Sequence, residues 1–220
     1  MTESAAKIGC ADETFDIGKV IGLFSSSIRD SDDDVDLSLY VQAYRELNKL
    51  FGILGIIFKF VEKDVADKEG IIARLIEKES DSYRSVSSMI SFEIGGPDTS
   101  PKNSGSRTLL RLHRALEFVI LFVQSTHDMD STGSVSHVCR SCYEKTLAHH
   151  HGWLIRQSVS VASRTLPTRE YLIKEIFAHH DEHVPQELID KHAKEFHEAA
   201  TEVYGRIQQL YSKNDILRLP

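Results

Sequence analysis

The amino-acid sequence predicts an all-α protein of about eight helices. Apolar residues recur at three- and four-residue steps along much of the 220-residue chain, which is the spacing of amphipathic helices. No segment alternates apolar and polar residues with a period of two over a useful length, so the sequence predicts no sheet. Apolar residues make up 41% of the chain and charged residues 27%, as in an ordinary globular protein with its own core.

The first third of the chain is expected to hold a loose tail and two helices. The tail covers residues 1–13, and the first helix covers residues 15–28. The acidic residues 30–34 form a break, which we interpret as a solvated loop that caps the next helix rather than as a metal site. A long helix is predicted over residues 35–66 and bends near Gly52 and Gly55. Its middle, LFGILGIIFKFV, is apolar on nearly every side and must therefore be buried.

Six further helices are predicted after this point. Two short ones cover residues 68–78 and 82–94, before a loop over residues 95–106 that is rich in Gly, Pro and Ser. A helix without Gly or Pro covers residues 107–122, and a polar break follows at 127–134. Residues 135–163 are helical in pattern, with Gly152 as an irregularity. After the turn Leu166-Pro167-Thr168, the last helices cover residues 168–178 and 186–211, separated by a loop at 181–185.

Three arginines mark one side of the helix at residues 107–122. Arg107, Arg111 and Arg114 lie at i, i+4 and i+7 and therefore point roughly the same way, while Glu117 is the one acid in the stretch. Guanidinium groups held this close repel one another unless an anion lies against them, and their planar fork matches the oxygens of phosphate. With large apolar residues around them, the arginines predict a lipid with an anionic head group.

The bulk properties limit the partners and the compartment. A net charge of −7 argues against nucleic acid as a partner. The first residues lack the apolar core of a secretory signal, and the longest apolar run, residues 51–58, is shorter than the roughly 18 residues that a membrane span needs. Three cysteines without a spacing framework fit a reducing compartment. We therefore expect a soluble, cytoplasmic protein. We also expect it to be a monomer.

Two further clusters each have a plain and a functional interpretation. Asp64 and Lys68 lie at i, i+4 directly after the most apolar stretch, and they form either a surface ion pair or part of a pocket mouth. The run from His149 to His151 cannot ligate one metal ion, because consecutive side chains on a helix fan out by about 100°. A single histidine that makes a hydrogen bond and a purely structural histidine both remain open. Trp153 belongs either to the core or to a membrane interface.

Other candidate sites have weaker support. Cys139 and Cys142 form a C-x-x-C pair, but no second pair or βαβ pattern accompanies them, so neither zinc nor redox chemistry is predicted. The histidines at 179, 180 and 183, with His192 and His197, are interpreted as a solvated surface. Neither a Gly-rich phosphate loop nor a nucleophile with an evident base is present, so the sequence does not predict an enzyme.

Three motifs in order resemble the glycolipid transfer protein superfamily. They are KDVADK, which contains Asp64 and Lys68, RTLLRLHRAL, which begins at Arg107, and HHGWLIR with the later TLPTRE. The likeness covers nearly the whole chain and is nearest to the branch that binds ceramide-1-phosphate, in its animal and plant forms. It implies one domain over residues 14–220, a two-layer helical sandwich that encloses one sphingolipid and needs no cofactor.

The resemblance also implies roles for individual residues. Asp64 would accept hydrogen bonds from the ceramide amide N–H and hydroxyl, and His151 would bind the ceramide carbonyl. Lys68, Arg107 and Arg111 would bind the phosphate, and Arg114 would support the site. Members that bind glycolipids carry Asn and Trp in place of Lys68 and Arg111, so the resemblance favours a phosphorylated ceramide over a glycosylceramide.

Apolar residues near these motifs are expected to line the pocket or the membrane. From helix phase and family likeness, the pocket walls are Ile53, Ile57, Phe60, Val61, Leu110, Phe118, Phe122 and Leu154, although plain core packing is an equal alternative for each. Trp153, Ile155 and Arg156 are the expected membrane contact.

The function expected from this resemblance is non-enzymatic transfer of ceramide-1-phosphate between membranes, with transient contact to their surfaces. Three alternatives stay open: a sphingolipid sensor that binds without transfer, a carrier of glycosylceramide, and an enzyme that acts on sphingolipid phosphate with Asp64 and His151 as base and acid.

Overall fold

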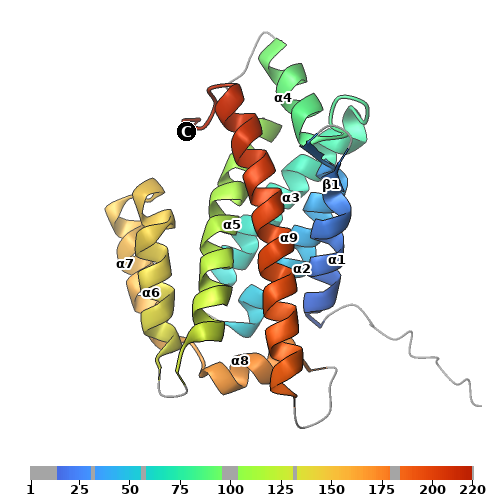
Figure 1. Ribbon diagram of the computed structural model, residues 1–220. Helices are drawn as coiled ribbons and strands as arrows, with labels where there is room; N and C mark the ends of the chain where they lie inside the picture. Colours follow the sequence, from blue (N-terminus) through green and yellow to red (C-terminus); the bar gives the residue numbers. More distant parts are fainter. Residues whose placement is uncertain are drawn as a thin grey trace, which may run out of the picture.

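The computed structural model describes residues 14–30, 33–55, 58–95, 104–130, 133–178 and 184–219, and it confirms the all-α class (Figure 1). Its α-helices are α1 (Ile17–Ser27), α2 (Leu37–Ile53), α3 (Lys59–Lys78), α4 (Val86–Gly95), α5 (Gly105–Asp128), α6 (Val135–Lys145), α7 (Trp153–Ala162), α8 (Arg169–Ile176) and α9 (Gln186–Lys213). The 3-10 helices η2 (Leu147–His150) and η3 (Ser163–Thr165) flank α7.

Polar side chains define where five of the helices begin. Each accepts a hydrogen bond from the backbone N–H three residues further on, which satisfies a donor that the first helical turn leaves without a partner. The capping residues are Asp16, Asp36, Ser104, Ser134 and Thr168, which precede α1, α2, α5, α6 and α8.

The prediction of one long helix over residues 35–66 is wrong. The chain leaves α2 after Ile53 and re-enters a helix at Lys59, and Gly55 between them has a φ of +109°, a left-handed backbone that favours glycine. The boundary predicted at residues 67–68 does not exist either, because no helix breaker stands there. Asp64 and Lys68 consequently lie within one continuous helix, α3.

The helix predicted over residues 135–163 divides at Thr146. This residue ends α6 with φ −120° and ψ −84°, and His151 and Gly152 are extended before α7 begins at Trp153. The division lets the chain turn, and η3, which follows α7, packs against α6.

The acidic break at residues 30–34 is not wholly a solvated loop. Its last residue, Asp34, belongs to a small antiparallel hairpin of β1 (Ile28–Arg29) with β2 (Asp34–Val35). Asp34 is buried, and its carboxylate accepts hydrogen bonds from the N–H groups of Val35 at 2.8 Å and Ser87 at 3.0 Å. The hairpin was not predicted, because two-residue strands are too short to show an alternating pattern.

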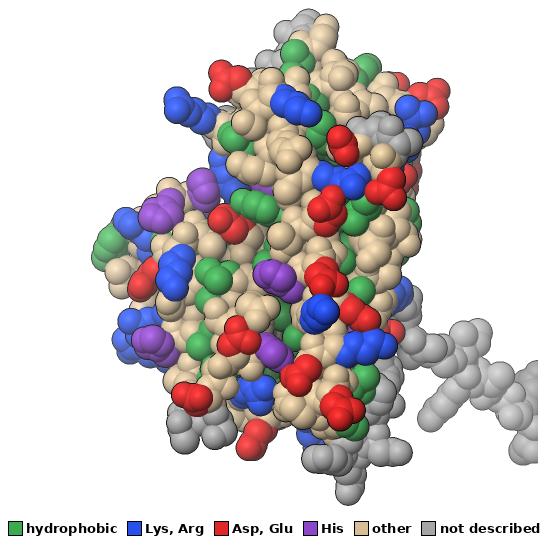
Figure 2. Space-filling view, in the orientation of Figure 1, with side chains coloured by type: hydrophobic (Ala, Val, Ile, Leu, Met, Phe, Trp, Pro, Cys, Tyr) green, Lys and Arg blue, Asp and Glu red, His purple; other side chains and the backbone are tan. Residues whose placement is uncertain are grey.

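Five helices close a ring around the core. Helix α1 packs on α2, α2 on α3, α3 on α5, α5 on α9, and α9 on α1. Figure 1 shows α9 in front with α2 and α3 behind it, α6 and α7 outside α5, and α8 across one end. On the face that carries α9, acidic and basic side chains are interspersed, as on an ordinary solvated surface (Figure 2). In the part of the chain that is described, none of the helices combines the length and apolar character that a membrane crossing requires.

Helix α5 is fixed by hydrogen bonds at its first turn. The Glu93 carboxylate accepts from the N–H groups of Gly105 at 2.6 Å and Ser106 at 2.9 Å, and from the Tyr83 hydroxyl at 2.9 Å. A carboxylate at this end also suits the positive end of the helix dipole. The direction of the helix that carries the three arginines therefore depends on α4.

Replacing Glu93 with alanine should lower the free energy of unfolding by about 1–3 kcal/mol, because three donors lose a charged acceptor. Urea denaturation followed by circular dichroism measures this change. Glu198→Ala, on the exposed face of α9, is the control and should change stability by about 0.5 kcal/mol or less. Equal effects of the two substitutions would contradict the role given to Glu93.

Candidate functional site

The charged residues identified in the sequence come from three segments that meet on α5. Helix α3 carries Asp64 and Lys68, α5 carries the three arginines, and His151 directly follows η2. Helix α5 contacts both α3 and η2. His151 lies near Asp64 and Lys68, and His150 lies near Arg114. The structure thus brings together residues that lie far apart in the sequence.

Asp64 and Lys68 form an ion pair in which the two charges have different surroundings. The Lys68 ammonium lies 2.5 Å from Oδ2 of Asp64 and 3.3 Å from the Asp64 carbonyl oxygen. The Asp64 side chain is 67% exposed, whereas that of Lys68 is 13% exposed. The carboxylate is therefore open to a further partner, while the ammonium lies against the protein.

His151 lies beside this pair and is neutral at neutral pH. Its pKa is lowered by burial, with the Lys68 ammonium acting in the same direction and the Asp64 carboxylate in the opposite one. A neutral imidazole presents one donor and one acceptor nitrogen. The ring can therefore donate a hydrogen bond to a neutral polar group or accept one from it.

Tyr143 on α6 holds the His151 ring, a contact that the sequence analysis did not anticipate. Its hydroxyl lies 2.9 Å from Nδ1 of His151, and burial raises the pKa of Tyr143, so the phenol keeps its proton. When Tyr143 donates to Nδ1, the ring proton stays on Nε2, the nitrogen that is left for another partner. The two residues are eight positions apart, on either side of the break at Thr146, and no sequence pattern indicates that they are in contact.

The three arginines have different surroundings. Arg114 donates to the carbonyl oxygens of Leu217 at 2.9 Å and Leu219 at 3.4 Å, and so ties α5 to the C-terminal residues. Arg111 is exposed and makes no hydrogen bond or ion pair with the residues that the structure describes, and Arg107 is half-buried on the first turn. Burial, and then the charge of Arg111, lowers the pKa of Arg114. The positive end of α5 therefore presents Arg111 to solvent.

An apolar face leads from Arg111 along α5. Arg111, Phe118 and Phe122 lie at i, i+7 and i+11 and share one side of the helix, and the two phenylalanine rings stack with their centroids 5.7 Å apart. Phe122 lies about 16 Å beyond Arg111, at 1.5 Å per residue. There it lines an apolar cavity of about 80 Å³, together with Leu54, which directly follows α2, and Leu172 of α8.

The predicted wall residues have different surroundings in the structure. Phe122 lines the cavity, Leu110 is buried in the core, and Ile53, Val61 and Phe118 are partly buried against it. Ile57 lies outside the described residues. Phe60 and Leu154 are 46% and 71% exposed, so neither lines a wall in this structure. Leu154 points outward because α7 begins only at Trp153 and contributes to the core through its last turn.

The residues expected to touch membranes form an exposed patch on α7. Trp153 is 67% exposed, and Ile155 and Arg156 are also exposed. Together with Leu154 they define what we call the α7 patch. Four adjacent exposed residues that include Trp, Leu and Ile are unusual on a helix bathed only by water.

The remaining candidates are the cysteines and histidines outside these motifs. Among the described residues, no group of three His, Cys, Asp or Glu side chains is placed to hold a metal ion. Cys139 and Cys142 are buried free thiols whose pKa values are raised by burial, which disfavours the reactive thiolate. The histidines at 179, 180 and 183 lie outside the described residues.

Known proteins share both the sequence pattern and this architecture. The model of the family described as Glycolipid transfer protein (GLTP) matches residues 35–178. The ceramide-1-phosphate transfer protein of Danio rerio is 33% identical over 215 residues, which cover 94% of this chain and 99% of that protein.

Two solved structures extend the comparison to the fold. The apo form of mouse ceramide-1-phosphate transfer protein is 31% identical with a TM-score of 0.86, and the match covers 94% of this chain and 100% of that one. The human protein in complex with 12:0 ceramide-1-phosphate is 32% identical with a TM-score of 0.81, covering 91% and 97% of the two chains.

The contact between Tyr143 and His151 predicts a measurable tautomer. In the wild-type protein, ¹⁵N NMR of the imidazole should show the proton mainly on Nε2, and Tyr143→Phe should shift the balance toward Nδ1–H because the donor to Nδ1 is lost. Tyr171→Phe, at an exposed tyrosine, should leave the His151 signals unchanged. An Nδ1–H tautomer in the wild type would contradict the assigned direction of the hydrogen bond.

Proposed function

Because this chain belongs to the glycolipid transfer protein (GLTP) family, we propose that it carries ceramide-1-phosphate between membranes without changing the lipid chemically. The observation that carries the proposal is that the Asp64–Lys68 pair beside His151 lies on segments in contact with α5, the helix that carries Arg107 and Arg111 at the head of its apolar face. The relatives named above as ceramide-1-phosphate transfer proteins, one of them solved with that lipid, support the choice of ligand.

The cationic side chains bind the phosphate. A phosphomonoester carries a charge between about −1 and −2 and three acceptor oxygens, and it needs several donors when it leaves water. Lys68 and Arg111 supply them from two helices, and Arg107 adds a third cation from the first turn of α5. Arg114 acts indirectly, because its hydrogen bonds to Leu217 and Leu219 hold the C-terminal residues against α5.

Asp64 and His151 form hydrogen bonds with the ceramide amide. The exposed carboxylate accepts from the amide N–H and the neighbouring hydroxyl, and the Nε2–H of neutral His151 donates to the amide carbonyl. Both groups of a buried amide need such partners, because an unsatisfied one costs about 1–3 kcal/mol. The two residues thus recognise a feature that glycerophospholipids lack.

The phosphate is a better match than a sugar. A neutral sugar would cover the charge of Arg111 without pairing with it, which is unfavourable in a site partly removed from water. The face that runs through Phe118 to Phe122 receives hydrocarbon, and the cavity at its end receives the end of a chain.

The α7 patch contacts the membrane in this proposal. Trp153 and Ile155 would enter the interface, with Arg156 near anionic lipid head groups. The chain would act in the cytoplasm and touch membranes transiently, as a carrier must do to collect and release its ligand. The family's role in lipid transfer supports this account, and no catalytic step is needed for it.

Asp64→Val should lower transfer of ceramide-1-phosphate between vesicles by at least about tenfold, because the amide and hydroxyl lose their shared acceptor. Fluorescent lipid transfer between donor and acceptor vesicles measures this loss. Asp67→Val, one turn further along the exposed side of α3, is the matched control and should transfer normally. Normal transfer by the Asp64 variant would remove Asp64 from the site.

Arg111→Leu should weaken binding of ceramide-1-phosphate much more than binding of unphosphorylated ceramide, because only the phosphate uses this cation. Titration of each lipid against the intrinsic fluorescence of Trp153 gives the two affinities, and Arg140→Leu on the exposed side of α6 serves as control. Equal losses for the two lipids would argue against a phosphate contact at Arg111.

A further inference from the structure

The cavity at the end of the apolar face is small for a lipid chain. Its volume is about 80 Å³, and side chains from α1, α2, α5, α8 and α9 line it. A cavity of about 150 Å³ holds one benzene molecule, so this one accommodates only a few methylene groups. A longer hydrocarbon chain can enter only if part of the wall moves outward.

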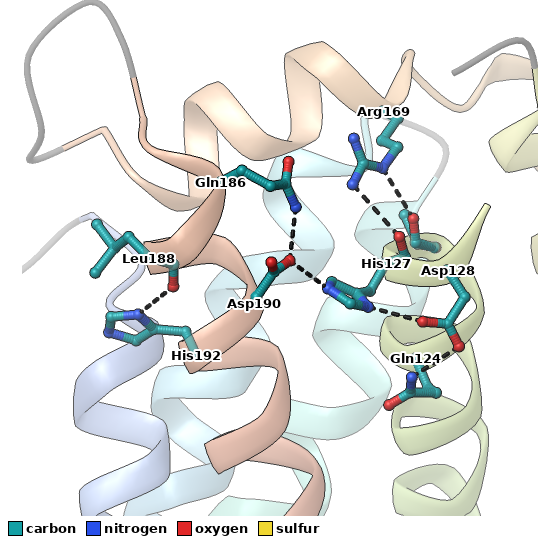
Figure 3. A network of polar contacts seen from close by, with 9 residues as sticks. Gln124, His127, Asp128, Arg169, Gln186, Leu188, Asp190 and His192 are labelled. Carbon is teal, nitrogen blue, oxygen red and sulfur yellow. Dashed lines mark hydrogen bonds and ion pairs between the residues drawn. The ribbon is translucent and has the colours of Figure 1, made fainter. Parts of the chain in front are cut away.

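A polar network closes the cavity where α5, α8 and α9 meet (Figure 3). His127, which lines the cavity, lies between two carboxylates: its Nδ1 is 2.8 Å from Asp128 Oδ1 and its Nε2 is 2.8 Å from Asp190 Oδ1. Gln186 also donates to Asp190, at 2.6 Å. The contact between His127 and Asp190 joins the last turn of α5 to the first turns of α9.

Helix α8 is tied to the same place. Arg169, another lining residue, donates to the carbonyl oxygens of Thr126 at 3.1 Å and His127 at 3.4 Å. These carbonyls belong to the last turn of α5 and have no partner within the helix. Arg169 therefore holds α8 against the end of α5.

The charge on the network strengthens it. Hydrogen bonds to Asp190 and Asp128 raise the pKa of His127, and the bonds to His127 contribute to lowering the pKa values of both carboxylates. Arg169 adds further positive charge from α8 near Asp190. Charge-assisted hydrogen bonds of this kind are stronger than neutral ones.

The walls of the cavity differ in how firmly they are held. Leu50, Leu54 and Phe122 are buried in the continuous core and cannot move without loss of its packing. Along α9, by contrast, the buried residues begin at Phe196, and α8 has one buried residue, Leu172. The first turns of α9 thus have no buried residue, and the contact of Asp190 with His127 is among the links that hold them to α5. They are the wall with the least buried packing behind it.

We propose that the His127–Asp190 contact limits the length of the hydrocarbon chain that the protein accepts. A chain that fits the cavity leaves the contact closed. A longer chain must separate the first turns of α9 from α5. The free energy needed to break the contact then lowers the affinity for the longer lipid. This inference rests on the proposed lipid transfer function and adds a residue pair that sets its chain-length preference.

Asp190→Ala tests the proposal, because Asp190 does not line the cavity and its loss leaves the apolar wall unchanged. Transfer between vesicles is measured for 12:0 ceramide-1-phosphate and for a species with a very long saturated acyl chain. We expect the ratio of long-chain to 12:0 transfer to rise about two- to fivefold, the range for a partly exposed ion pair. Asp190→Asn keeps an acceptor for His127 without the charge and should give a smaller rise.

Glu195→Ala is the matched control, because it removes an exposed ion pair with Lys191 on the same helix. Its transfer ratio should equal that of the wild type. An unchanged ratio in Asp190→Ala, or the same rise in the control, would overturn the proposal. The carrier function would still stand in that case, provided that the wild type transfers the 12:0 lipid. If the wild type transferred neither lipid, the proposed function itself would fail.

Hydrogen exchange gives an independent readout. Amides of residues 186–195 should exchange faster in the complex with the very long chain than in the complex with the 12:0 lipid. Equal protection in the two complexes would show that α9 does not move to admit the longer chain.

Discussion

The hydroxyl groups of two buried tyrosines donate hydrogen bonds to backbone carbonyls of α5, Tyr44 to Leu112 and Tyr211 to Ser106. Between them His113 pairs with Gln208 at 2.7 Å and stacks on Tyr204, and burial lowers the pKa of His113 to about 4, so it stays neutral. These contacts fix α5 in position and rotation. Three arginines on one helix repel one another, and a helix held in this way keeps their positions fixed. The cationic site therefore depends on the buried polar contacts behind it.

In the proposed function, the same helix couples recognition of the head group to burial of the hydrocarbon. Because Arg111, Phe118 and Phe122 share one face, a ligand whose phosphate meets Arg111 is directed along the phenylalanines toward the cavity. At the far end the polar contacts of His127 tie that cavity to α8 and α9. In this proposal a single helix sets the position of the head group, the direction of the chain and the place where the chain must end.

Much of this arrangement could be predicted from local sequence patterns. Helical periodicity gave the class, and the spacing of the arginines and of Asp64 with Lys68 indicated which side chains share a face. The interruption at Thr146 could not be predicted, because residues 135–163 contain no proline and their pattern favours a continuous helix. Contacts such as His127 with Asp190, 63 residues apart, depend on how helices pack and carry no local signal. The exposure of Leu154 follows from the same interruption, which changes the phase of α7.

The central claim is that cations and an amide-binding pair together select a phosphorylated ceramide, and competition for lipids in one membrane tests it most directly. Vesicles containing equal amounts of ceramide-1-phosphate, galactosylceramide and phosphatidic acid are incubated with the protein, and the lipids bound to it are identified by mass spectrometry. The account predicts that ceramide-1-phosphate is extracted in preference to both competitors, since galactosylceramide lacks the phosphate and phosphatidic acid lacks the amide. Preferential extraction of galactosylceramide would contradict the phosphate site at Lys68 and Arg111, and equal extraction of phosphatidic acid would contradict the roles of Asp64 and His151.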